Sequence, residues 1–306
     1  MTTLLQTLVS ALSLGSVYAL IALGYTLVYG VLRFINFAHS DVFTLGAWSA
    51  VSVAGAIGWS VTGGGHFALP VVLAASMAIC AVVGVTIEAL AYRPLRRAPR
   101  LNVLITAIGV SLLMQNVGQL RWAFGPTPTA SPRLMTDHTV TTLAGVRIGT
   151  VDVAIVELAV MLMLCLEVLV YRTRLGRAMR AVSFDERTAS LMGINVNRVV
   201  SITFAIGSAL AAAAGVIYTM KYPTVGQPAD ATWILLGLKA FIAAVVGGIG
   251  NVRGAVAGAM MIAGLEKFGA AYVSSRMENV YVFAVLILVL LLRPSGLFGR
   301  AVVEKV

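Results

Sequence analysis

The sequence predicts an all-α polytopic membrane protein, a bundle of eight or nine transmembrane helices with a small external hairpin loop and a helix on the cytosolic side. Of its 306 residues, 59% are hydrophobic and 11% are charged, whereas about a quarter of the residues in soluble domains are charged. Charged residues are absent from the stretches 1–32, 42–87, 101–120 and 199–220. Each stretch reaches the ~20 apolar residues that cross a hydrocarbon core of about 30 Å.

The predicted spans follow one another along the whole chain. They are 4–30, 41–60, 68–92, 103–122, 152–171, 199–220, 232–250, 254–272 and 279–293. The second and third share one uncharged stretch, which is broken at Gly63-Gly64-Gly65-His66. The seventh and eighth are glycine-rich and form either two full crossings or a re-entrant pair, so the total is eight or nine. The ninth is short, and it crosses only if its flanking arginines snorkel or the helix begins earlier.

Two connections are longer than turns. The first, 123–151, contains HTVTTLAGVRIGTV, and this alternation of β-branched residues around Ala144-Gly145 predicts a small hairpin on the outer face. The second, 172–198, is polar and basic, and its spaced apolar residues predict a helix.

The 22 lysines and arginines predict the orientation. With nine crossings, 15 of them fall on the side that holds 172–198 and the C-terminus, and seven fall on the other side. The positive-inside rule therefore places 172–198 and the C-terminus in the cytoplasm, and the N-terminus in the periplasm, of a bacterial inner membrane. The charge count favours nine crossings. Because the basic residues crowd at span ends, the net charge of +10 needs no nucleic-acid partner.

Asn36, His39 and Asp41 lie between the first two spans, in the segment RFINFAHSD of residues 33–41. Polar groups at membrane depth are costly unless they are paired or hydrated. Asn36 and Asp41 could cap the ends of a broken helix, or the three residues could line a transport pathway or its inner gate. We favour caps, because Asn and Asp beside a helix break are typical capping residues.

The fourth span carries a polar stripe. Ser111, Gln115 and Gln119 recur every fourth residue, and Thr106 lies nearer the start of the span. A spacing of four puts side chains on one helix face, which must meet other helices or water instead of lipid. Hydrogen bonds between helices and a pathway lining explain this stripe equally well.

Charged residues also occur inside the later spans. Lys239 is the deepest basic residue, so we expect it to have a partner within the bundle, and it is a further candidate for the pathway or its gate. Glu266 and Lys267 lie near an outer span end, where we expect them to snorkel to the interface. No metal site is predicted, because the three histidines fall on different loops and no close carboxylate–histidine spacing supports one.

The 172–198 connection holds a candidate coupling segment, FDERTASLMG, at residues 184–193. It predicts a short amphipathic helix with acidic residues at its N-terminus and a glycine at its C-terminal end. An ATP-driven transporter needs such a rigid cytosolic element to fit a groove of its ATPase, whereas a solvated amphipathic loop is the alternative. The candidate coupling residues are Phe184, Asp185, Glu186, Arg187, Ala189, Met192 and Gly193.

Four motifs point to one family. They are GSVYALIALGYTLVYGVLRFINFAHSDVFTLGAW, the 172–198 connection, GLKAFIAAVVGGIGNVRGAVAGA and LLRPSGLFG. In this order they resemble LivH-type permease subunits of branched-chain amino-acid ABC importers, over nearly the whole chain. One departure is Ser40, because the family usually has Gly between the His and the Asp of its I-N-F-A-H-G-D motif.

The resemblance implies a permease subunit of an ATP-driven ABC importer for branched-chain or related amino acids; relatives carry urea or short amides. It implies a second, related permease chain, two cytosolic ATPases that hold ATP and Mg²⁺, and a periplasmic substrate-binding protein. The chain, 1–306, would then be one transmembrane permease domain in contact with lipid, and it would catalyse no covalent reaction.

Other classes of protein fit the sequence less well. The chain has no G-x-x-x-x-G-K-[ST] pattern, so we expect no ATP or other cofactor on this chain itself. An ion-coupled secondary transporter usually has clustered buried carboxylates or unwound helices that bind the ion, but Glu157 and Glu167 do not form such a cluster. A membrane-embedded enzyme is disfavoured because H-E-x-x-H and G-x-S-x-G patterns are absent.

Overall fold

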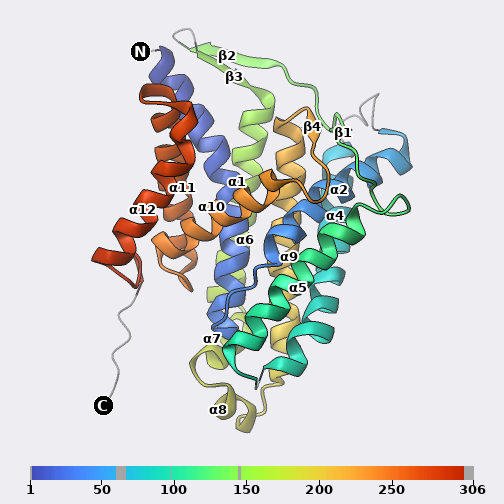
Figure 1. Cartoon of the computed structure of the whole chain (residues 1–306), viewed down its shortest axis with the longest axis vertical. Coiled ribbons are helices and arrows are strands. Elements are labelled where there is room, and N and C mark those ends of the chain that lie inside the picture. Colours follow the sequence, from blue (N-terminus) through green and yellow to red (C-terminus); the bar gives the residue numbers. More distant parts are fainter. Residues whose placement is uncertain (1, 60–66, 97, 144–145, 300–306) are drawn as a thin grey trace.

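A helix corresponds to each predicted span in the computed structural model, which describes residues 2–59, 67–96, 98–143 and 146–299 (Figure 1). These helices are α1 (Thr2–Leu32), α2 (His39–Ile57), α4 (Ala68–Ile87), α5 (Arg100–Gly118), α6 (Thr150–Arg172), α9 (Val196–Lys221), α10 (Ala231–Gly247), α11 (Val252–Tyr272) and α12 (Glu278–Leu292). Among the described residues, seven helical segments are long and apolar enough to cross a membrane, and α10 is a shorter apolar helix. The all-α polytopic class is therefore confirmed.

Short elements complete the chain. They are the π-helical turn η2 (Glu88–Tyr92), the 3-10 turns η3 (Arg93–Leu95) and η4 (Ser275–Met277), helices α7 (Arg174–Phe184) and α8 (Glu186–Leu191), and strands β1 (Thr129–Ala130), β2 (Thr139–Leu143), β3 (Val146–Gly149) and β4 (Thr224–Val225). The predicted hairpin is present, because β2 and β3 pair antiparallel with Thr142 opposite Arg147. Strand β1 pairs antiparallel with β4.

The strands and the short helices mark opposite ends of the bundle. Both small sheets lie at the end where the chain starts, which we call the hairpin end, and α7 and α8 lie at the other, which we call the α8 end (Figure 1). The predicted helix break at Gly63-Gly64-Gly65-His66, the turn at Ala144-Gly145 and the last residues, 300–306, lie outside the described residues.

Helix α2 begins inside the bundle instead of at its end. After α1, the chain turns at Arg33, which has a positive φ of 55°, and folds back along α1. The His39 ring lies 4.6 Å from that of Tyr25, and a Cβ atom on Gly24 would overlap the His39 ring. Gly24 lies eight residues before the end of α1, which is about 12 Å at 1.5 Å per residue. The second half of the polar segment, from Asn36 to Asp41, therefore lies within the bundle, whereas Arg33 is exposed.

Helix α1 forms the centre of the bundle and packs against α6, α9, α10 and α11. From Tyr18 to Leu23 its side chains are completely buried. In contrast, α5, α6 and α12 expose many large apolar side chains, such as Leu113, Leu164 and Leu291. Exposed apolar surface of this extent is typical of helices that contact lipid or another membrane subunit.

Helices α2 and α9 cross with their backbones in contact. A Cβ atom on Gly46 would overlap the Ala212 backbone, and one on Gly215 would lie 2.5 Å from Ala47 N. Small residues at such a crossing allow the close packing that stabilises helix pairs in membranes.

We therefore expect Gly46→Ala to destabilise the folded chain by about 1–3 kcal/mol, because α2 and α9 must separate to admit the methyl group. The matched control is Gly55→Ala on the same helix, where an added Cβ would contact nothing within 4 Å and alanine is the better helix former. Denaturant unfolding of the purified protein in detergent measures both. Equal stability of the two variants would show that the α2–α9 contact is not tight.

Candidate functional site

The α8 end presents three large apolar side chains to the outside. Phe184 is 88% exposed, Leu191 82% and Met192 80%, and we call these three residues the α8 tip. Met179, Val182 and Ala189 of the same segment are buried, so the segment has one face on the bundle and one face free. The predicted amphipathic helix is therefore present, in two short pieces.

Both ends of α8 are fixed. The Asp185 carboxylate accepts hydrogen bonds from the backbone amides of Arg187 at 2.9 Å and Thr188 at 3.2 Å. Hydrogen bonds from the Thr188 hydroxyl and from these amides lower the pKa of Asp185, so the cap stays ionised at neutral pH and weakens only as the pH falls through that lowered value. Gly193 follows the helix with a φ of +82°, as the predicted glycine end requires. Glu186 and Arg187 are exposed on the same turn.

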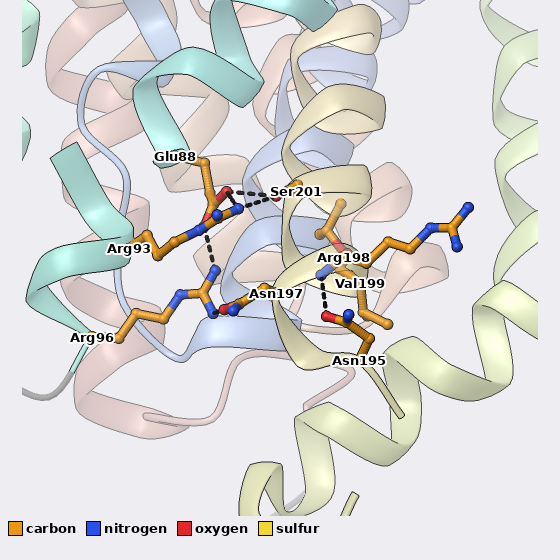
Figure 2. Close-up of polar contacts among 9 residues, drawn as sticks. Glu88, Arg93, Arg96, Asn195, Asn197, Arg198, Val199 and Ser201 are labelled. Carbon is orange, nitrogen blue, oxygen red and sulfur yellow. Dashed lines mark hydrogen bonds and ion pairs between the residues drawn. The ribbon is translucent and has the colours of Figure 1, made fainter. Parts of the chain in front are cut away.

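A charged network joins η2 and η3, the turns that follow α4, to the start of α9 (Figure 2). The Glu88 carboxylate is completely buried and forms ion pairs with Arg93, at 3.1 Å, and with Arg96. It also accepts a hydrogen bond of 2.6 Å from the Ser201 hydroxyl, and Arg96 donates to Asn197 Oδ1 at 2.7 Å. Ser201 and Asn197 lie in the first turns of α9, which the chain enters from α8. The start of α9 is therefore held against the turns η2 and η3 that follow α4.

Glu88 was not among the site residues predicted from the sequence. A signal was present, because Glu88 is the one acidic residue between Asp41 and Asp137, and an arginine-rich segment follows it. Its partners Asn197 and Ser201, however, lie more than 100 residues away, and one sequence cannot show that pairing.

We expect Glu88→Gln to destabilise the chain by about 1.5–3 kcal/mol, because the amide removes the charge that satisfies the buried Arg96. The control is Glu157→Gln, since Glu157 is exposed on α6. Thermal unfolding of both purified variants tests this prediction, and a Glu88→Gln protein as stable as the control would rule out a structural ion pair.

The predicted caps at Asn36 and Asp41 are wrong. Residue Ala38 occupies the N-cap position of α2, and no side chain caps the helix. Asn36 instead accepts a hydrogen bond of 2.6 Å from the Tyr92 hydroxyl of η2. His39 is buried beside α1, and within the described ranges no group of three or more metal-ligating side chains exists.

The polar stripe of α5 meets this segment at one point. Gln115 donates from Nε2 to Asp41 Oδ1 at 2.9 Å and to Ser111 Oγ at 3.1 Å. Gln119 is at the end of α5 as its C-cap, and Thr106 is partly exposed, so these two do not join the contact. A hydrogen bond between helices, one of the two explanations left open for the stripe, is therefore present at Gln115.

Lys239 has the bundle-internal partner that we expected. Its ammonium lies 3.1 Å from the Glu266 carboxylate and 3.8 Å from that of Glu278, and the Tyr18 hydroxyl donates to Glu266 at 2.9 Å. The snorkelling predicted for Glu266 is wrong, because its side chain is buried in this contact. Lys267 is partly exposed.

Comparison with known proteins identifies the family. Residues 7–292 match the family described as the permease component of the branched-chain amino acid transport system. The chain belongs to this family of permeases. It is 40% identical to the high-affinity branched-chain amino acid transport system permease protein BraD of Pseudomonas aeruginosa, over 99% of this chain and 98% of BraD.

Other relatives agree with this assignment. The chain is 38% identical to the LivH permease protein of Escherichia coli K12, over 99% of this chain and 97% of LivH. Among solved structures, a chain of PsaBC from Streptococcus pneumoniae in complex with Fab aligns with 96% of this permease at 12% identity. Its TM-score of 0.47 is too low to support an argument about the fold.

The family motifs meet in pairs within the permease. The ending LLRPSGLFG packs on the glycine-rich α10–α11 turn, where Leu297 N donates to Val246 O at 2.8 Å and Asn251 Nδ2 donates to Phe298 O at 3.0 Å. The N-terminal motif contacts α10, because a Cβ on Gly237 would overlap Ser40. Ser40, which departs from the family pattern, therefore lies at the contact between α2 and α10.

Proposed function

We propose that this permease is a membrane-spanning subunit of an ATP-driven importer that carries branched-chain amino acids across a bacterial inner membrane. The activity for which BraD and LivH are named supports this substrate class. The chain would act with a second, related permease chain, and a periplasmic binding protein would deliver the substrate. Two cytosolic ATPases, which bind ATP and Mg²⁺, would supply the energy, and this chain would hydrolyse nothing.

The observation that carries the proposal is the α8 tip. Large exposed apolar side chains mark a surface that a partner covers, and the capped helix α8 and the residues that flank it present these three in a fixed geometry. We infer that an ATPase docks on Phe184, Leu191 and Met192, with Asp185, Glu186 and Arg187 at the rim of the contact. The α8 end is then cytoplasmic and the hairpin end periplasmic, as the distribution of basic residues supports.

The Glu88 network offers a physical connection from the docking site to the membrane interior. Movement of α8 would displace the start of α9. There Asn197 accepts a hydrogen bond from Arg96, and Ser201 donates one to Glu88. Glu88 begins the turn η2, and the last residue of η2, Tyr92, donates a hydrogen bond from its hydroxyl to Asn36. We propose that the pathway is lined by Asn36, His39 and Asp41 on one side and by the α5 face with Thr106, Ser111, Gln115 and Gln119 on the other.

Uptake by membrane vesicles tests the proposed function. Vesicles that contain the chain, its partner permease and both ATPases, with the binding protein outside, are expected to accumulate radiolabelled leucine, isoleucine and valine when ATP is present inside. A proton uncoupler should leave this uptake unchanged. Uptake that persists without ATP and collapses with the uncoupler would contradict ATP-driven transport, and uptake of urea or acetamide in place of leucine would contradict the substrate.

A further inference from the structure

A small cavity lies between α2 and α5, next to the contact between Asp41 and Gln115. Its volume is about 30 Å³, which is the volume that one water molecule takes up in the liquid. Asp41, Thr44 and Gln115 are its polar lining residues, and Leu45, Trp48 and Met114 provide much of its apolar wall. The Asp41 carboxylate and the Gln115 amide therefore face a cavity whose wall is mainly apolar.

One oxygen of the Asp41 carboxylate is unused. Asp41 is 5% exposed, and its Oδ1 accepts from Gln115. Its Oδ2 is buried and has no hydrogen-bond partner in the part of the chain that the structure describes. None of the ion pairs among those residues includes Asp41. Because a buried, unpaired carboxylate is costly, its retention beside a cavity points to a cationic ligand with hydrogen-bond donors.

The cavity is covered towards the hairpin end. The Trp48 indole stacks on Phe124 at 5.3 Å between centroids and donates to Gly226 O at 3.1 Å. A Cβ on Gly118 would lie 2.8 Å from Pro228 Cβ, so the loop before α10 closes on the end of α5. Movement of this loop would expose the Asp41 carboxylate to the hairpin end, where the substrate arrives in the proposed function.

Helix α5 is the wall best able to move. It packs chiefly on α2 and on η2, and its other faces are exposed. The cavity as it stands admits one ammonium group and no whole amino acid, so the remainder of a substrate needs α5 to separate from α2. Leu45, Met114 and Trp48 would then meet an aliphatic side chain attached to that ammonium.

We propose that Asp41 binds the primary ammonium group of the amino acid as it passes between α2 and α5. The proposal rests on the proposed function, because the substrate class comes from there. Gln115 positions the carboxylate by holding Oδ1, which leaves Oδ2 to accept from the ammonium. The apolar wall favours substrates whose side chain is aliphatic.

Ligand-dependent melting of the purified complex, with the partner permease and the ATPases but without the binding protein, tests this site. Leucine and leucinamide are expected to raise the melting temperature of the wild-type complex and of the Glu157→Gln control, because ligands that bind the native state stabilise it. In Asp41→Asn both ligands should bind at least about tenfold more weakly, since a charge-assisted hydrogen bond is lost. The acid that lacks the amine, 4-methylpentanoate, should have no effect.

Several results would overturn the ammonium site. One is that Asp41→Asn binds leucine with wild-type affinity, and another is that 4-methylpentanoate raises the melting temperature as much as leucine does. The site would also be refuted if leucine or leucinamide left the melting temperature of the wild type unchanged, or if sodium or potassium displaced leucine. If Asp41→Asn does not fold, Leu45→Phe fills the cavity instead, and undiminished leucine binding in that variant would refute the site. Leucine uptake by the wild-type complex, returned to vesicles with the binding protein outside, separates the two proposals. Absent uptake refutes the proposed function, whereas normal uptake with a failed melting test refutes the ammonium site alone.

Discussion

Replacement of both Leu191 and Met192 by serine is expected to abolish ATP-driven leucine uptake while the chain still inserts and folds. Both side chains are almost fully exposed, so their removal leaves the packing of the bundle unchanged. In the proposed complex they are buried against an ATPase, where each contributes about 1.5–3 kcal/mol. Loss of both should weaken docking at least about a hundredfold.

The assay is uptake by vesicles, together with the amount of ATPase that copurifies with the permease. Ser190→Ala is the matched control, because Ser190 is exposed on the same short helix and its hydroxyl donates a local hydrogen bond to Arg187 O. Normal uptake and normal ATPase recovery in the Leu191→Ser/Met192→Ser variant would contradict a docking role for the α8 tip.

Lys239→Met is expected to destabilise the folded permease by about 3–5 kcal/mol. The substitution leaves the buried Glu266 carboxylate without its cation, and a buried unpaired charge costs more than the intact pair gains. Combining Lys239→Met with Glu266→Gln should restore most of the stability, because a neutral amide still accepts the hydrogen bond from Tyr18. Non-additive effects of this kind identify residues in direct contact.

Unfolding of the single and double variants in detergent measures the effect. The control is Lys267→Met on α11. Because Lys267 is partly exposed, this substitution should change the free energy of unfolding only slightly. A Lys239→Met protein as stable as the Lys267→Met protein, or a double variant less stable than Lys239→Met, would contradict a structural ion pair.

The sequence predicted what depends on local pattern. Apolar stretch length predicted the spans, the β-branched alternation predicted the β2–β3 hairpin, and Asp185 and Gly193 predicted the ends of α8. The depth of Lys239 predicted a partner, because a lone charge in a membrane is costly, although the identity of that partner was not predicted.

What the sequence did not predict depends on contacts between distant residues. The fold-back after α1 places Asn36 next to Tyr92. The Tyr92 hydroxyl therefore donates a hydrogen bond to the amide oxygen of Asn36, which we expected to cap a helix. Glu266 is buried because Lys239 approaches it from α10, where proximity to a span end alone suggested snorkelling. The Glu88 network joins residues more than 100 positions apart, and its parts carry no common local motif.

Site-specific crosslinking tests most directly whether the α8 end faces the cytoplasm and binds the ATPase. Cysteine is introduced at Met192 in a chain whose exposed Cys165 is replaced by serine; Cys80 is buried. We expect a short bifunctional thiol reagent to join Met192→Cys to an ATPase in the assembled complex, and Met135→Cys, in the segment that leads into the hairpin, to form no such product. Crosslinking of Met135→Cys to the ATPase, with none from Met192→Cys, would contradict both the orientation and the docking site.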